Sequence, residues 1–188
     1  METALSILVG LGLSAAVGFR VFVPLLIMGV AAQTGYLTLA SGFAWIGSTP
    51  ALIAFGVATV LEIAGYFIPW VDHVLDVIAA PAAVVAGTIA TAGTVVNIDP
   101  FFRWTLAIIA GGGIAGLIHG LTGATRVVST ITSAGVTNPG VALAEAGSSV
   151  VLSVLAILLP VIAFAIVLAL LVYAVKKISR RVWRSSSP

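Results

Sequence analysis

The chain has 188 residues, of which 61% are hydrophobic and 7% are charged, and it contains no cysteine. A soluble domain normally carries about a quarter charged residues, so this composition predicts a protein of the lipid bilayer. The absence of cysteine excludes disulfide bonds, thiolate metal sites and a cysteine nucleophile.

Five apolar segments predict an all-α integral membrane protein whose single transmembrane domain covers residues 1–175. The segments are 3–32, 51–68, 71–96, 101–134 and 141–175. Because one helical span needs about 20 residues, the 30 to 35 residues of the first, fourth and fifth segments predict broken or re-entrant helices. The expected sites of these breaks are Gly18 and Pro24, Gly111–Gly113 and Gly123, and Pro160.

The first and fourth segments share a short phrase that begins with arginine. It reads RVFVPLLIMGV from Arg20 and RVVSTITSAGV from Arg126, with arginine, valine and the final Gly-Val pair at the same offsets. The phrase predicts an inverted-topology repeat with halves of about 1–96 and 97–175. Such repeats are typical of transporters, whose binding sites lie near the bilayer midplane.

The C-terminal residues 176–188 form a basic tail. Five of the eight basic residues lie there, namely Lys176, Lys177, Arg180, Arg181 and Arg184. The positive-inside rule predicts a cytoplasmic tail, which could also touch anionic lipid headgroups. Five crossings counted back from the tail place the N-terminus outside and the Asn97–Arg103 loop inside. So short a tail does not predict nucleic-acid binding.

Buried arginines carry the main functional prediction, because a charge near the middle of a bilayer is costly without a partner or a task. Arg20 and Arg126 offer planar forks of donors to an anionic substrate, and His119 shares a helix face with Arg126. Glu62 and Glu145 are expected to balance charge or to carry protons. The alternative is that each arginine extends its head group to a membrane interface or pairs with an internal carboxylate.

A second candidate cluster follows the Ile68-Pro69 corner. Asp72 and Asp76 are four residues apart and share one helix face, so together with His73 they could bind a cation. The alternative is an ordinary acidic start of an interfacial helix. No cofactor is predicted, and no motif of hydrolases, P-loop proteins or dinucleotide-binding proteins occurs. The sequence therefore does not favour an enzyme, although a membrane hydrolase using His73 or His119 stays open.

The phrases GFRVFVPLL, SGFAWIGSTPAL and EIAGYFIPWVDHVLD resemble the bacterial family known as domain of unknown function 4126. The resemblance implies a small multi-pass protein of the inner membrane. It extends over most of the chain and includes Arg126, Asn138-Pro139 and Glu145. Tyr66-Phe67 replaces a charged pair of the family, and Ala146 replaces the second of two adjacent acids. The resemblance implies no activity.

The residues together predict a membrane transporter or channel-like protein with a polar site at the midplane, acting on a small or lipid-linked anionic solute. The alternatives are a cation-conducting channel that uses its acidic residues, a scaffold that transports nothing, and a membrane-embedded hydrolase. Many glycines and alanines at four-residue spacing favour close helix contacts and a homodimer.

Overall fold

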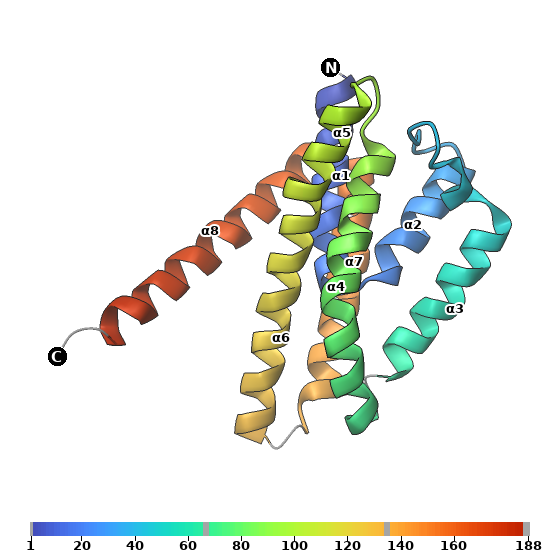
Figure 1. Ribbon diagram of the computed structural model, residues 1–188. Coiled ribbons are helices and arrows are strands. Elements are labelled where there is room, and N and C mark those ends of the chain that lie inside the picture. Colours follow the sequence, from blue (N-terminus) through green and yellow to red (C-terminus); the bar gives the residue numbers. More distant parts are fainter. Residues whose placement is uncertain (1, 66–67, 134–135, 186–188) are drawn as a thin grey trace.

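The computed structural model describes residues 2–65, 68–133 and 136–185, and this part of the chain is helical without any strand (Figure 1). The α-helices are α1 (Glu2–Phe19), α2 (Phe22–Gln33), α3 (Thr49–Gly65), α4 (Pro69–Thr94), α5 (Pro100–Leu106), α6 (Gly113–Ser133), α7 (Asn138–Leu158) and α8 (Pro160–Ser185). A 3-10 turn, η1 (Ala44–Gly47), precedes α3, and a π-helical turn, η2 (Ala107–Gly112), joins α5 to α6.

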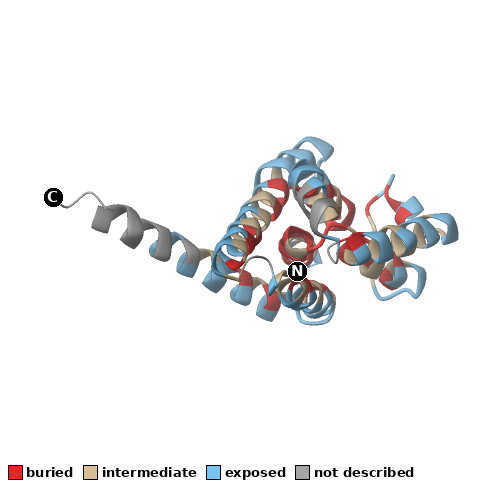
Figure 2. Ribbon diagram, turned by 90° about the horizontal axis from the view of Figure 1, so that it is seen from below, coloured by how far each residue is buried: buried red, intermediate tan, exposed pale blue. Residues whose placement is uncertain are grey.

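Helix α1 forms the centre of the molecule, and α4, α6, α7 and the start of α8 pack around it (Figures 1 and 2). Its residues from Val9 to Gly18 are all buried. Small side chains allow the close approach: a Cβ on Gly18 would lie 2.5 Å from the Cβ of Ile118. Ser14 Oγ donates to the carbonyl of Gly87 at 2.6 Å, which ties α1 to α4.

Four helical segments are long and apolar enough to cross a membrane. They are Glu2–Phe19, Val77–Thr94, Pro100–Ser133 and Asn138–Leu158. Large apolar side chains such as Ile109 and Ile131 point away from the protein, with 71% and 78% of their surface exposed. Such outward-facing apolar residues fit a multi-pass protein surrounded by lipid.

The first apolar segment is divided, as the position of Gly18 predicts. Helix α1 ends at Phe19, and α2 begins at Phe22 and runs back toward the end of the bundle where α1 began (Figure 1). Pro160 likewise starts a new helix after α7 ends at Leu158. The predicted breaks at these two places are confirmed.

The predicted placement of the N-terminus and the Asn97–Arg103 loop on opposite sides is wrong. The amide of Val96 donates to Ser6 Oγ at 3.3 Å, and Asn97 Nδ2 to Glu2 Oε2 at 3.5 Å, so both regions share one end of the bundle. The reversal after α1 returns the first segment to its starting end. Counting that segment as a single crossing therefore assigned the later loops to the wrong ends.

The predicted break near Gly123 is also wrong, because α6 continues through this residue. A single glycine inside a helix costs only about 1 kcal/mol relative to alanine, too little to end a helix by itself. The fourth segment is irregular at the other glycines instead, where η2 includes Gly111 and Gly112. Helices α1 and α6 also run in the same direction (Figure 1), so the antiparallel relation required by the inverted repeat is not seen between them.

Candidate functional site

The break between α1 and α2 exposes backbone amides that a distant side chain satisfies. Arg20 N still donates to Ala16 O at 3.2 Å, which completes α1. The next two amides, of Val21 and Phe22, donate to the two carboxylate oxygens of Glu62 at 2.8 and 3.2 Å. Glu62 is a buried residue of α3, 7% exposed. Its negative charge therefore lies at the N-terminus of α2, where the helix dipole favours an anion.

Pro24 fits the first turn of α2 for a related reason. Proline lacks an amide hydrogen, and the first amides of a helix have no acceptor within the helix. Placing Pro24 two residues after Phe22 therefore costs no helical hydrogen bond, and its fixed φ favours the helical turn. The sequence around the break thus supports both the end of α1 and the start of α2.

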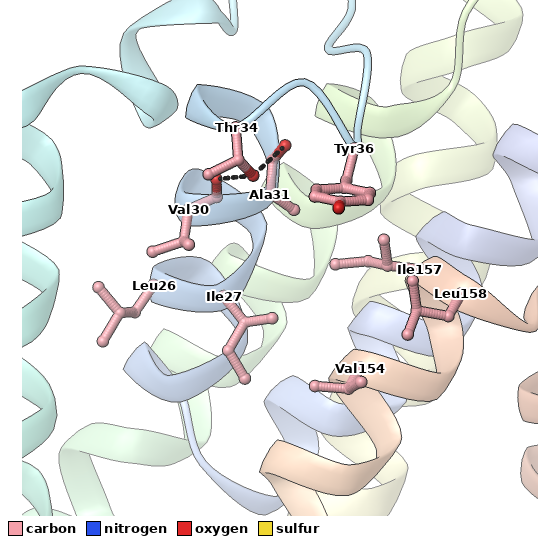
Figure 3. A pocket seen from close by; sticks show the side chains of 9 residues that line it. All are labelled: Leu26, Ile27, Val30, Ala31, Thr34, Tyr36, Val154, Ile157 and Leu158. Atoms are coloured by element: carbon pink, nitrogen blue, oxygen red, sulfur yellow. Dashed lines mark hydrogen bonds between the residues drawn. The ribbon is translucent and has the colours of Figure 1, made fainter.

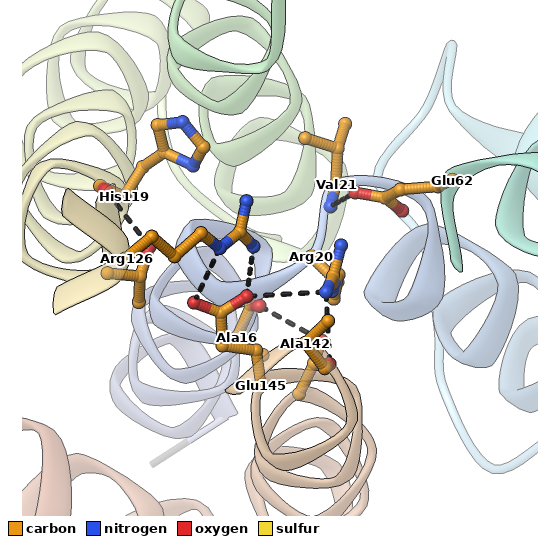
Figure 4. Close-up of polar contacts among 10 residues, drawn as sticks. Ala16, Arg20, Val21, Glu62, His119, Arg126, Ala142 and Glu145 are labelled. Atoms are coloured by element: carbon orange, nitrogen blue, oxygen red, sulfur yellow. Dashed lines mark hydrogen bonds and ion pairs between the residues drawn. The ribbon is translucent and has the colours of Figure 1, made fainter. Parts of the chain in front are cut away.

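Arg20, in the break after α1, and Arg126, on α6, converge on the carboxylate of Glu145 (Figure 4). Arg20 Nη2 lies 3.3 Å from Glu145 Oε2 and donates to the carbonyl of Ala142 at 3.0 Å. Arg126, from α6, donates through Nε to Glu145 Oε1 at 3.1 Å and through Nη2 to Oε2. The three charged residues are 1%, 4% and 5% exposed. We call them the Arg-Glu-Arg cluster.

The geometry of the Arg-Glu-Arg cluster matches the way arginine binds a carboxylate or phosphate group. Arg126 uses two donors of one guanidinium on the two oxygens of one carboxylate, which is the bidentate arrangement that arginine also offers to phosphate. The cluster is therefore chemically suited to a carboxylate or phosphate group, and Glu145 occupies it in this structure.

Hydroxyl groups fix the helices on both sides of the cluster. Ser149 lies one turn after Glu145 on α7, and its Oγ donates to the carbonyl of Ala16 on α1 at 3.0 Å. On α6, Ser129 lies one turn after Arg126 and bonds to Thr137 and Asn138 at 2.6 and 2.7 Å. The polar residues after Arg126 therefore hold α6 and α7 together at their turn.

The structure brings together some of the predicted site residues and separates others. Glu145 contacts both arginines, whereas the sequence analysis expected both Glu62 and Glu145 to balance charge. Glu62 instead bonds to the backbone of α2. His119 is half-buried on α6 on the side near Arg126 (Figure 4), but its side chain makes no hydrogen bond to the cluster.

The side chains of the predicted cation site are not among those that the structure describes. Asp72, His73 and Asp76 belong to α4, but their side-chain positions are not described. Among the described side chains, no three histidine, aspartate or glutamate residues converge as metal ligands.

Two features of the site were missed by the sequence analysis. The carbonyl of Ala142 accepts from Arg20, and Ser149 joins α7 to α1. The spacing of Ala142, Glu145 and Ser149 along one helix face is the only sequence signal that points to either feature.

Comparison with known proteins places the chain in a family without adding an activity. The chain matches no curated protein and no solved structure. One family model matches residues 7–180, which is most of the chain and includes every residue of the Arg-Glu-Arg cluster. The chain belongs to the family described as Domain of unknown function (DUF4126).

Proposed function

We propose that the protein is a membrane transporter or channel-like protein that takes the anionic group of a small or lipid-linked solute at the Arg-Glu-Arg cluster. The observation that carries this proposal is the convergence of two buried guanidinium groups on one carboxylate. A buried charge in a membrane protein is expensive, and such residues commonly mark a substrate path. The cluster also lies beside a helix break, where transporters often bind their substrates.

In the proposed mechanism Glu145 holds the site while no substrate is bound. An incoming carboxylate or phosphate would replace the Glu145 carboxylate on Arg126, where the guanidinium offers two parallel donors. Release of Glu145 would loosen α7 from α6 at this level, because Arg126 holds it there, while Ala142 and Ser149 would still connect α7 to Arg20 and α1. Substrate binding and helix movement would then be coupled through one side chain.

A structural role is the second candidate, and the same contacts favour it. Glu145 already provides a buried counter-charge for both arginines, so the cluster could serve only to join α1, α6 and α7. The protein would then be a scaffold that transports nothing. The two functions differ in whether an added anion binds.

The test compares Arg126→Lys with Arg103→Lys in purified protein. Arg103 is a half-buried arginine on α5 that lies 6.0 Å from the ring centre of Phe43, outside the cluster. We expect inorganic phosphate or glycerol phosphate to raise the melting temperature of the wild type and of Arg103→Lys but not of Arg126→Lys. Lysine keeps the charge and loses the bidentate fork. If neither anion changes any melting temperature, the transporter function is rejected in favour of the scaffold function.

We further propose that the protein forms a homodimer in the bacterial inner membrane, and that residues 176–188 lie near anionic headgroups on the cytoplasmic side. The basic composition of the tail supports this orientation. Gly113 and Gly120 have open space beside them on α6, and small residues let a second helix approach closely. A cysteine at Gly120 should therefore form a disulfide-linked dimer in the membrane, and a monomer under oxidising conditions would contradict this arrangement.

A further inference from the structure

An apolar groove lies between α2 and the C-terminal half of α7, separate from the Arg-Glu-Arg cluster. Its volume is about 620 Å³, and the walls are formed by residues that include Ile27 and Val30 of α2 and Val154, Ile157 and Leu158 of α7. Figure 3 shows Ile27 pointing across the groove toward Val154 and Ile157, with the ring of Tyr36 at one end. Neither wall offers a charged group.

Hydrogen-bonding groups occur only at the Tyr36 end of the lining. Thr34 is one of them, but its hydroxyl donates to the carbonyls of Val30 and Ala31 at 2.8 and 3.3 Å. Tyr36 is held over the groove because its backbone amide donates to Ala31 O at 2.8 Å. An occupant must therefore be hydrocarbon along its length and can meet a polar side chain only near Tyr36.

The size of the groove favours a narrow occupant. An α-helix with its side chains is about 10 Å wide, so a helix from another protein would meet the groove mainly with the side chains of one face. A single lipid chain is much thinner than a helix and can lie along the groove between its two walls.

The direction of the groove and its aromatic end also fit a lipid. One wall belongs to α7, a helix long enough to cross the membrane, so the groove follows the direction of the surrounding lipid chains. Trp45 lies in η1, which follows Tyr36 along the chain. Trp104 packs on Phe43 with ring centres 5.9 Å apart. Tryptophan and tyrosine favour the level of the lipid headgroups.

We propose that the groove binds one acyl chain of a phospholipid, with the headgroup beside Tyr36. Hydrocarbon gains little from leaving the bilayer, because lipid tails are as apolar as leucine. The acyl chain is held instead by dispersion contacts on two sides, from α2 and from α7. A convex helix surface would contact it on one side only. This proposal does not depend on anion binding at the cluster.

The experiment uses the full chain in vesicles of phosphatidylethanolamine and phosphatidylglycerol whose acyl chains carry a photoreactive diazirine. We expect labelling at Ile27 and Ile157 to exceed labelling at Ile131, which is 78% exposed and outside the groove. Val154→Trp should fill the groove and lower labelling there several-fold while Ile131 is labelled as before. Val151→Trp is the matched control, because Val151 is exposed on the same helix outside the lining.

Four outcomes would overturn the proposal. Equal labelling of the groove and Ile131 would mean ordinary surrounding lipid. Unchanged labelling in Val154→Trp would show that the labelled lipid does not occupy the groove, provided that this variant melts at the same temperature as Val151→Trp. If Val154→Trp does not fold, Ile27→Trp fills the groove from the other wall. Labelling by a free diazirine fatty acid but not by the phospholipid would reject the phospholipid. A disulfide between Ile27→Cys of one copy and Ile157→Cys of another would assign the groove to a dimer.

Discussion

The carboxylate of Glu145 serves two guanidinium groups, so this residue contributes to two buried ion pairs at once. Arg20 approaches it from the break after α1 and Arg126 from α6, while Glu145 itself belongs to α7. Removing one partner of a buried pair costs about 3–5 kcal/mol, because the remaining charge loses its compensation. The loss of Glu145 acts on two cations, whereas the loss of either arginine leaves Glu145 with the other.

We therefore expect Glu145→Gln to lower the free energy of unfolding more than Arg126→Gln does. Glutamine keeps the size of glutamate but is shorter than arginine, so the loss in Arg126→Gln also includes lost packing and the comparison understates the effect of the charge. Glu2→Gln is the control, because Glu2 is exposed at the N-terminus. Equal losses in Glu145→Gln and Arg126→Gln, measured by denaturant unfolding in detergent, would show that Arg20 and Glu145 contribute little to each other.

Close helix contacts depend on particular glycines, and the structure separates these from glycines that have open space. On α1, a Cβ at Gly18 would lie 2.5 Å from Ile118 Cβ and 2.7 Å from Ala115 O. Gly123 on α6 has no atom within 4 Å of such a Cβ. The same substitution should therefore have opposite effects in the two helices.

Gly18→Ala is expected to destabilise the protein by about 1–3 kcal/mol, because the added methyl group forces α1 and α6 apart. Gly123→Ala should instead be neutral or stabilising by up to about 1 kcal/mol, since alanine favours a helix interior. The measurement is the melting temperature of each purified variant. A loss in Gly123→Ala as large as that in Gly18→Ala would contradict the packing described for α1.

The arrangement of the whole molecule follows from the reversal of the chain between α1 and α2. The N-terminus and the loop after α4 lie at one end, and the α6–α7 turn lies at the other (Figure 1). Ala40 N donates to Gly93 O at 2.8 Å, so the loop after α2 belongs to the first end as well. These contacts define which regions share a side of the membrane.

Cysteine labelling should reproduce this division, and the natural chain contributes no background because it has no cysteine. A membrane-impermeant thiol reagent added to one side should label Glu2→Cys and Ser41→Cys together. Gly140→Cys, in the first turn of α7, should be labelled only from the other side. Labelling of Glu2→Cys and Ser41→Cys from opposite sides would contradict the reversal.

The sequence predicts local features of this fold better than its long-range contacts. Helical segments and the breaks at Gly18 and Pro160 follow from hydropathy and from residues that interrupt helices. The bonds from Glu62 to the amides of Val21 and Phe22 join residues about 40 positions apart, which no local pattern reveals. Apolar composition also does not show whether a long segment crosses once or turns back, and the loop assignments were wrong for that reason.

The π-helical turn at Ala107–Gly112 has a consequence for insertions and deletions. A π-turn closes its hydrogen bonds one residue further along the chain than an α-turn, so it accommodates one additional residue. Deleting Ile109 should convert this turn to α-helix and leave Arg126 directed at Glu145. Deleting Gly120, where α6 is regular, should rotate Arg126 by about 100° and separate it from Glu145. Membrane yield and melting temperature should therefore survive the first deletion and fall sharply after the second, which makes η2 the place in α5–α6 where the chain tolerates a change of length.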